Sequence, residues 1–144
     1  MPRVNESISI NAPVEKVFAY VENPVNRPEF WPSLVEVKDI ERLPNGGTKL
    51  RWVYKMASVR AEGTGETIEY IPNKRVVDHN KGGISSTIAW SVEPEGDGTK
   101  VTFEGDYDIH LPVLRKLALS FLVRLNEQEA KTLLTNIKAK MEAE

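Results

Sequence analysis

The chain has 144 residues, of which 40% are hydrophobic and 28% are charged, and this composition is typical of a globular protein that buries a single core. Its 19 basic and 21 acidic residues leave a net charge of −2, which argues against nucleic-acid binding because that function usually requires a basic excess. The absence of cysteine excludes disulfides, thiolate nucleophiles and zinc–thiolate sites.

The first residues of the chain lack the positively charged segment and apolar run of a secretion signal. The most apolar window, residues 117–125, contains Arg124 and is too short to span a membrane. We therefore expect one domain over residues 1–144, a cytoplasmic location and no stable membrane insertion.

The first part of the chain predicts a strand followed by a helix. Residues 4–10 alternate between apolar and polar side chains, as a half-buried strand does. Pro13 then stands where a helix would begin, and residues 14–21 carry valine and phenylalanine at helical spacing. Asn23-Pro24 ends this helix, and residues 25–32 predict a short helical turn.

The middle of the chain predicts a series of strands separated by turn signals. Asn-Gly, Gly-Gly and Asp-Gly pairs supply the positive φ angles that tight hairpins require. Pro72-Asn73-Lys74 marks one further turn. The segments that all these turns delimit are 34–43, 48–56, 59–71, 75–80, 84–93 and 100–109. Together with the first strand, they predict seven strands in one antiparallel sheet.

Alternation along these strands predicts one dry and one solvated face of the sheet. The dry face carries most of the aromatic residues of the strands, including Trp52 and Tyr54. Arg60, Glu62 and Glu66 share one face of the fourth strand, and we interpret them as part of the solvated face.

Two glycines of the fourth strand, Gly63 and Gly65, are two positions apart and therefore share one face. Glycine within a strand allows a sheet to bend sharply, and this is our interpretation of the pair. Neither a GxGxxG nor a GxxxxGK[ST] motif stands between a strand and a helix, so the glycines do not form a phosphate-binding loop.

The end of the chain predicts one long helix. Residues 112–144 contain no glycine and no proline after Pro112, and their apolar residues recur at helical spacing. Such a helix buries its apolar stripe by lying across the sheet, an arrangement that leaves room for a cavity. Residues 117–125 are apolar on almost every side, so Leu119 and Val123 require another partner. The candidate partners are the loop of Phe30-Trp31, a second subunit of a homodimer, and a membrane surface during ligand uptake.

Three segments of the chain carry a family resemblance. The first segment is Ser9-Ile10-Asn11-Ala12-Pro13-Val14-Glu15-Lys16-Val17-Phe18, followed by Asn23-Pro24 and Phe30-Trp31-Pro32. The second is Glu69-Tyr70-Ile71-Pro72-Asn73-Lys74-Arg75-Val76-Val77, and the third is Gly98-Thr99-Lys100-Val101-Thr102-Phe103. They resemble the opening, the middle hairpin and the last strand of the START-like helix-grip (SRPBCC) superfamily. The best match is the branch of polyketide cyclase/dehydrase and lipid-transport proteins, and it covers essentially the whole chain.

The resemblance implies an α+β helix-grip fold, in which a curved seven-stranded antiparallel sheet wraps around the long C-terminal helix and two short helices follow the first strand. It also implies a cavity for lipids, polyketides, quinones or other apolar molecules. It implies no single activity, because one fold supports many functions, and it offers no catalytic motif that could be carried over to this chain.

Aromatic and apolar residues of the dry face and of the helix are the predicted lining of this cavity. They are Trp52, Tyr54, Trp90, Phe103, Tyr107, Leu114, Ala118, Phe121 and Leu122. The small Ala118 leaves room for a ligand, and Tyr54 and Tyr107 could orient it through their hydroxyl groups. The alternative interpretation is that these residues only pack the core.

The two histidines, His79 and His110, show neither HxH nor HExxH spacing, so we expect no metal site and no cofactor. Histidine is the usual acid or base at neutral pH, but we favour exposed, polar roles for both residues.

Three functions are compatible with the sequence. The leading hypothesis is a binding or carrier protein for a small apolar ligand such as a lipid, polyketide or quinone. The second is a cyclase or dehydratase that uses the same cavity, with Tyr54, His79 and Tyr107 as candidate catalytic residues. The third is a protein-interaction module that uses Leu119 and Val123. The sequence identifies no catalytic residue and leaves open whether the protein is an enzyme.

Overall fold

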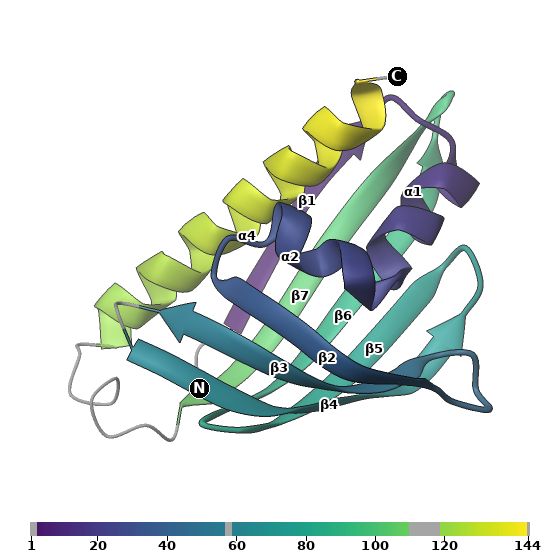
Figure 1. Ribbon diagram of the computed structural model, residues 1–144. Helices are drawn as coiled ribbons and strands as arrows, with labels where there is room; N and C mark the ends of the chain where they lie inside the picture. Colours follow the sequence, from purple (N-terminus) through teal and green to yellow (C-terminus); the bar gives the residue numbers. More distant parts are fainter. Residues whose placement is uncertain (1–2, 57–58, 110–118, 144) are drawn as a thin grey trace.

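The computed structural model describes residues 3–56, 59–109 and 119–143, which form one curled antiparallel sheet with helices packed inside the curl (Figure 1). The seven strands are β1 (Arg3–Ile10), β2 (Leu34–Arg42), β3 (Thr48–Met56), β4 (Val59–Ile71), β5 (Arg75–Gly82), β6 (Ile84–Glu95) and β7 (Gly98–Ile109). Their spatial order is β1-β7-β6-β5-β4-β3-β2, and all six pairings are antiparallel. The prediction of a seven-stranded antiparallel sheet is therefore confirmed.

The tight turns use the residues that the sequence indicated. Gly46 and Gly96 adopt φ angles of 96° and 59°, and Asn73 adopts a φ angle of 59° in the turn between β4 and β5. Glycine and asparagine tolerate this left-handed region better than other residues. The hairpins therefore close as predicted, and β5, β6 and β7 each extend beyond the predicted segments into the turns.

Three short helical segments follow β1 and lie over the sheet (Figure 1). The first helix, α1 (Val14–Glu22), buries Val17, Phe18 and Val21 at the predicted helical spacing. The side-chain oxygen of Asn23 then accepts a hydrogen bond from the backbone N–H of Val25 and so starts the 3₁₀ turn η1 (Pro24–Asn26). The helical turn α2 (Arg27–Phe30) follows directly and confirms the predicted short helix.

The C-terminal helix α4 (Leu119–Glu142) runs alongside β1 and contacts α1 and α2 (Figure 1). Its buried stripe consists of Ala130, Leu133, Leu134, Ile137 and Met141. These positions repeat every three or four residues, as expected for one face of a helix. The prediction that the helix begins at Pro112 falls partly on residues 110–118, which lie outside the described residues, as do the side chains of Leu119 and Val123.

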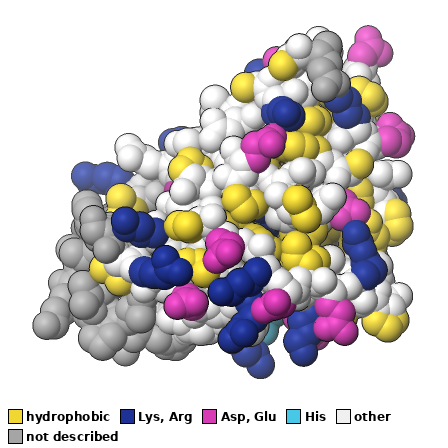
Figure 2. All heavy atoms as spheres, viewed as in Figure 1, with side chains coloured by type: hydrophobic (Ala, Val, Ile, Leu, Met, Phe, Trp, Pro, Cys, Tyr) yellow, Lys and Arg dark blue, Asp and Glu magenta, His cyan; other side chains and the backbone are white. Residues whose placement is uncertain are grey.

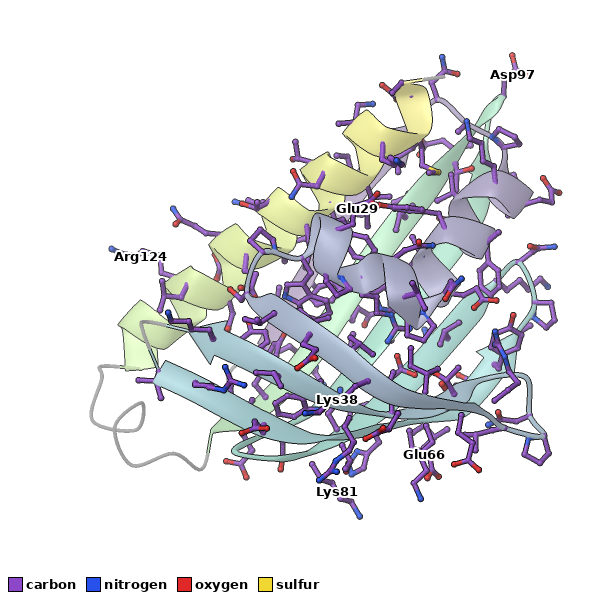
Figure 3. The ribbon with its side chains drawn as sticks, viewed as in Figure 1. Glu29, Lys38, Glu66, Lys81, Asp97 and Arg124 are labelled. Atoms are coloured by element: carbon purple, nitrogen blue, oxygen red, sulfur yellow. The ribbon has the colours of Figure 1, made fainter. Side chains whose placement is uncertain are left out.

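The outer face of the sheet is polar. Arg60, Glu62 and Glu66 are exposed, which confirms their assignment to the solvated face. Glu66 and Lys81 point away from the helices (Figure 3). In the view of Figure 2, hydrophobic and charged side chains are interspersed over the surface. The apolar residues of the inner face form one continuous core with α1, α2 and α4.

Candidate functional site

A cavity of about 60 Å³ lies between the inner face of the sheet and the helices α2 and α4. Most of its wall is aromatic or aliphatic, and a smaller part is polar. The lining residues are Arg27, Trp31, Leu34, Val37, Leu50, Trp52, Tyr54, Asp78, Asn80, Ile84, Ser86, Ile88, Trp90, Tyr107 and Asn126. Inward-facing residues of strands β2, β3, β5, β6 and β7 thus contribute to the same wall.

Four of the residues predicted to line a cavity, Trp52, Tyr54, Trp90 and Tyr107, do so. Phe103 does not belong to the wall. It is 1% exposed and packs edge-on against Trp90 and Trp31, at ring-centroid distances of 4.8 and 5.7 Å. Phe103 therefore supports the wall from behind. Leu114 and Ala118 lie outside the described residues, and so do the side chains of Phe121 and Leu122.

The glycines of β4 make room for two of the lining side chains. A Cβ atom added at Gly63 would lie 2.4 Å from Cζ2 of Trp52, and one added at Gly65 would lie 2.5 Å from Oδ1 of Asn80. At Gly63 the added Cβ atom would also lie 2.2 Å from the backbone oxygen of Lys81, so no larger residue fits there, whereas at Gly65 the Asn80 side chain would have to turn away. Gly63 and Gly65 therefore allow Trp52 and Asn80 to lie close against the sheet, a role more specific than the predicted bend.

Trp31, which follows α2, fills the centre of the space between sheet and helix. It is 6% exposed, and its indole meets the rings of Tyr54, Trp90 and Phe103 edge-on. Its indole N–H donates a hydrogen bond of 2.8 Å to Oε1 of Glu129 on α4. This bond links the loop after α2 to the long helix, and the indole limits the size of the cavity.

The two tyrosines of the cavity are neutral phenols at neutral pH. Burial raises the pKa of Tyr54 well above its ordinary value, and the nearby negative charge of Glu129 raises it further. The pKa of Tyr107 is raised by the same two causes in the same order. The Tyr54 hydroxyl donates to the Glu129 carboxylate. Neither tyrosine is suited to act as a phenolate base at neutral pH.

All four tyrosines of the chain are expected to resist ionisation in the folded protein. Burial is also the main cause of the raised pKa of Tyr20 and Tyr70, and hydrogen-bonded glutamates add to it. Because each pKa in the folded state exceeds that of the unfolded chain, the stability is unaffected below pH of about 10 and falls as the pH rises above it. Absorbance at 295 nm should show little phenolate in native protein at a pH where urea-unfolded protein is half ionised. Equal titration curves would contradict the expectation.

A buried ion pair forms the polar part of the wall. Nη1 of Arg27 lies 3.1 Å from Oδ2 of Asp78, and the two side chains are only 10% and 8% exposed. The other carboxylate oxygen of Asp78 accepts a 2.8 Å hydrogen bond from the Thr67 hydroxyl, which in turn accepts one from the backbone N–H of Thr48. The pair thus connects α2 to strands β3, β4 and β5.

Several polar atoms of the wall lack a hydrogen-bond partner among the described residues. They are Nε of Arg27, Nε1 of Trp52, Nε1 of Trp90, and both Nδ2 and Oδ1 of Asn126. Asn80, by contrast, donates to the Ser86 hydroxyl at 3.1 Å. Buried polar atoms are normally paired, so water or a ligand in the cavity would satisfy these atoms.

The polar residues of the wall were not predicted from the sequence, although the positions of two of them in their elements indicate that they face inward. Asn126 stands four residues before Ala130 and so interrupts the buried stripe of α4 with an amide. Asp78 follows Val76 at a spacing of two, which places a carboxylate on the dry face of β5. Arg27 carries no such signal, because it lies in a short helical turn between Asn26 and Pro28.

The one described histidine lies away from the cavity. His79 is exposed on the outer face of β5, where its Nδ1 lies 3.3 Å from the Thr87 hydroxyl. His110 lies outside the described residues. Within residues 3–56, 59–109 and 119–143, no group of three or more His, Asp or Glu side chains could hold a metal ion. No helix of the same ranges is long and apolar enough to cross a membrane.

Residues 1–142 match the family described as polyketide cyclase/dehydrase and lipid transport, and the chain belongs to this family. Curated protein sequences give no significant match. Among solved structures, the chain is similar to the protein TTHA0849 from Thermus thermophilus, with 24% identity over 99% of this chain and 98% of that one and a TM-score of 0.76.

Two further structures show the same fold. A START superfamily protein from Mycobacterium smegmatis is 16% identical over 98% of this chain and 97% of that one, with a TM-score of 0.83. The Zhui aromatase/cyclase from a Streptomyces species is 13% identical over 97% and 93%, with a TM-score of 0.80. The START-like helix-grip fold is therefore established.

Proposed function

We propose that this protein binds and carries a small, largely apolar ligand in the cavity between its sheet and α4. The observation that carries the proposal is the composition of the cavity wall, in which three tryptophans, two tyrosines and several aliphatic residues surround a few polar groups. Binding sites for small molecules are typically built in this way.

The volume of the cavity limits what it holds without rearrangement. Typical ligand sites measure about 300–1,000 Å³, whereas this cavity measures about 60 Å³, which is room for water. A ligand with one or more rings therefore requires side chains to move. Trp31 is the side chain best placed to do so, because it follows a short helical turn and occupies the centre of the space.

The proposal is tested by native mass spectrometry of the purified protein, with solvent extraction of any bound molecule. We expect a discrete added mass, or a rise in melting temperature with a lipid, quinone or polyketide analogue. A ligand present at about one hundred times its Kd stabilises a fold by about 2.7 kcal/mol, a readily measured shift. An unliganded mass together with no shift across the panel would contradict the proposal.

A cyclase or dehydratase activity is the second candidate, and the hydrogen bond between Tyr54 and Glu129 favours it. Because Tyr54 lines the cavity as a neutral phenol and donates its only hydroxyl proton to Glu129, the pair would take a proton from a reactive ligand: the proton passes to the Tyr54 oxygen while the Tyr54 proton passes to the Glu129 carboxylate. Turnover of a poly-β-ketone substrate analogue separates the candidates. An enzyme loses turnover in Tyr54→Phe, and a carrier shows no turnover in either form.

A further inference from the structure

The unpartnered atoms of the cavity wall indicate which polar groups a ligand of this cavity would carry. Four of them are donors, namely Nε of Arg27, Nδ2 of Asn126 and the indole Nε1 atoms of Trp52 and Trp90. A single one, Oδ1 of Asn126, is an acceptor. The four residues that carry these atoms are almost fully buried, so bulk water does not satisfy the atoms. Arg27 is 8% exposed, Trp52 7%, Asn126 3% and Trp90 2%. The complement of such a wall is a molecule that offers an acceptor oxygen to these donors.

The charges around the cavity indicate that this molecule is neutral. The guanidinium of Arg27 is already paired with the carboxylate of Asp78, so the wall has no surplus positive charge among the described residues. The carboxylate of Glu129, which accepts hydrogen bonds from Trp31 and Tyr54, adds a negative charge beside the cavity. A buried anionic ligand would meet these two carboxylates without an unpaired cation in the described wall to offset them.

The aromatic and aliphatic residues of the wall favour a ligand with a flat, aromatic ring system. The rings of Trp31, Trp52, Tyr54, Trp90 and Tyr107 line the cavity together with aliphatic side chains. Aromatic rings favour offset-stacked or edge-on contacts with other rings. An aromatic ligand would therefore find partners on several sides, whereas a flexible alkyl chain would gain only apolar burial.

Resting on the ligand-binding function proposed above, we propose that the cavity selects a neutral aromatic molecule that carries a phenolic hydroxyl or a ketone. Its oxygen accepts hydrogen bonds from one or two of the four donors on Arg27, Asn126, Trp52 and Trp90, because an oxygen offers two lone pairs. A phenolic hydroxyl matches Asn126 best, because it accepts a hydrogen bond from Nδ2 and donates one to Oδ1. A carboxylate of the same shape is excluded by charge, and a pure hydrocarbon leaves the donors unpaired.

Three probes of one shape test the inference, namely 2-naphthol, 2-methylnaphthalene and 2-naphthoate. Calorimetry on the full chain should give a Kd for 2-naphthol at least about tenfold lower than the Kd of either other probe. The Asn126→Leu variant should lower the preference for 2-naphthol over 2-methylnaphthalene toward unity. The control Gln128→Leu removes an exposed amide from the same helix and should keep the preference.

A second measurement needs no variant with altered binding. In ¹H–¹⁵N spectra the indole N–H signals of Trp52 or Trp90 should move downfield with 2-naphthol and not with 2-methylnaphthalene. The complex with 2-methylnaphthalene serves as the reference, because Trp31 is expected to move with either ligand.

The outcomes separate this inference from the proposed function. Equal affinities of the three probes, or tightest binding of 2-naphthoate, would leave the cavity a ligand site and overturn the selection of a neutral oxygenated molecule. Water would then satisfy the unpaired atoms in all complexes. Failure of all three probes to bind would overturn this inference, whereas the ligand-binding function would fall only if native mass spectrometry and the wider panel of analogues also gave no binding.

Discussion

Replacement of Arg27 by methionine is expected to lower the free energy of unfolding by about 3–5 kcal/mol. The variant would leave the carboxylate of Asp78 buried beside the cavity with the Thr67 hydroxyl as its remaining partner. An uncompensated buried charge is among the most destabilising changes that a single substitution can cause. Urea unfolding followed by tryptophan fluorescence measures the loss.

Two further variants show whether the charge is the cause. The double variant Arg27→Met/Asp78→Leu removes both charges and should recover most of the lost stability, because apolar residues of similar volume can replace a buried pair. Arg3→Met breaks an exposed pair with Asp106 and should change stability little. A double variant as unstable as Arg27→Met would show that packing of the arginine stem, and not charge, holds α2 on the sheet.

Replacement of Trp31 by alanine is expected to lower the free energy of unfolding by about 3–5 kcal/mol and at the same time to improve ligand binding. The loss of stability follows from the contacts of the indole with Tyr54, Trp90 and Phe103, and from its bond to Glu129. The gain in affinity follows from the space that the indole vacates at the centre of the cavity. Unfolding and calorimetry with 2-naphthol measure the two effects.

Two matched variants separate the roles of the indole. Trp31→Phe keeps an aromatic ring and removes the N–H donor to Glu129. It should therefore lose less stability than Trp31→Ala and gain little affinity for 2-naphthol. Phe30→Ala deletes a residue that is 1% exposed and is not part of the cavity wall, so it should lose comparable stability without a gain in affinity. Weaker binding of 2-naphthol to Trp31→Ala would contradict the idea that Trp31 limits the cavity.

Local patterns in the sequence were sufficient to predict the architecture. The alternation along β3 assigned Trp52 and Tyr54 to the dry face, and the Gly46 and Asn73 turns marked where hairpins close. These signals are local, because strand faces follow a period of two and tight turns depend on a few residue types. The helical spacing in α4 was equally clear, with Leu133, Leu134 and Ile137 buried on one stripe.

The aromatic part of the candidate site could be predicted and the polar part could not. Four aromatic residues were assigned to the cavity because the side chains of the dry face point toward the helices. They are Trp52, Tyr54, Trp90 and Tyr107. Phe103 satisfies the same pattern but lies behind Trp31 and Trp90, because the pattern gives the face of a residue and not its depth.

The sequence by itself determined the order of the strands along the chain, the faces of each strand and the apolar stripe of the last helix. Only the tertiary structure decided that Arg27 meets Asp78, that Asn126 closes the same cavity and that Trp31 fills its centre. These contacts join residues more than forty positions apart in the chain on separate elements. Periodicity reports on neighbours within one element, whereas the meeting of side chains from α2, β5 and α4 depends on how the whole sheet curls around its helices.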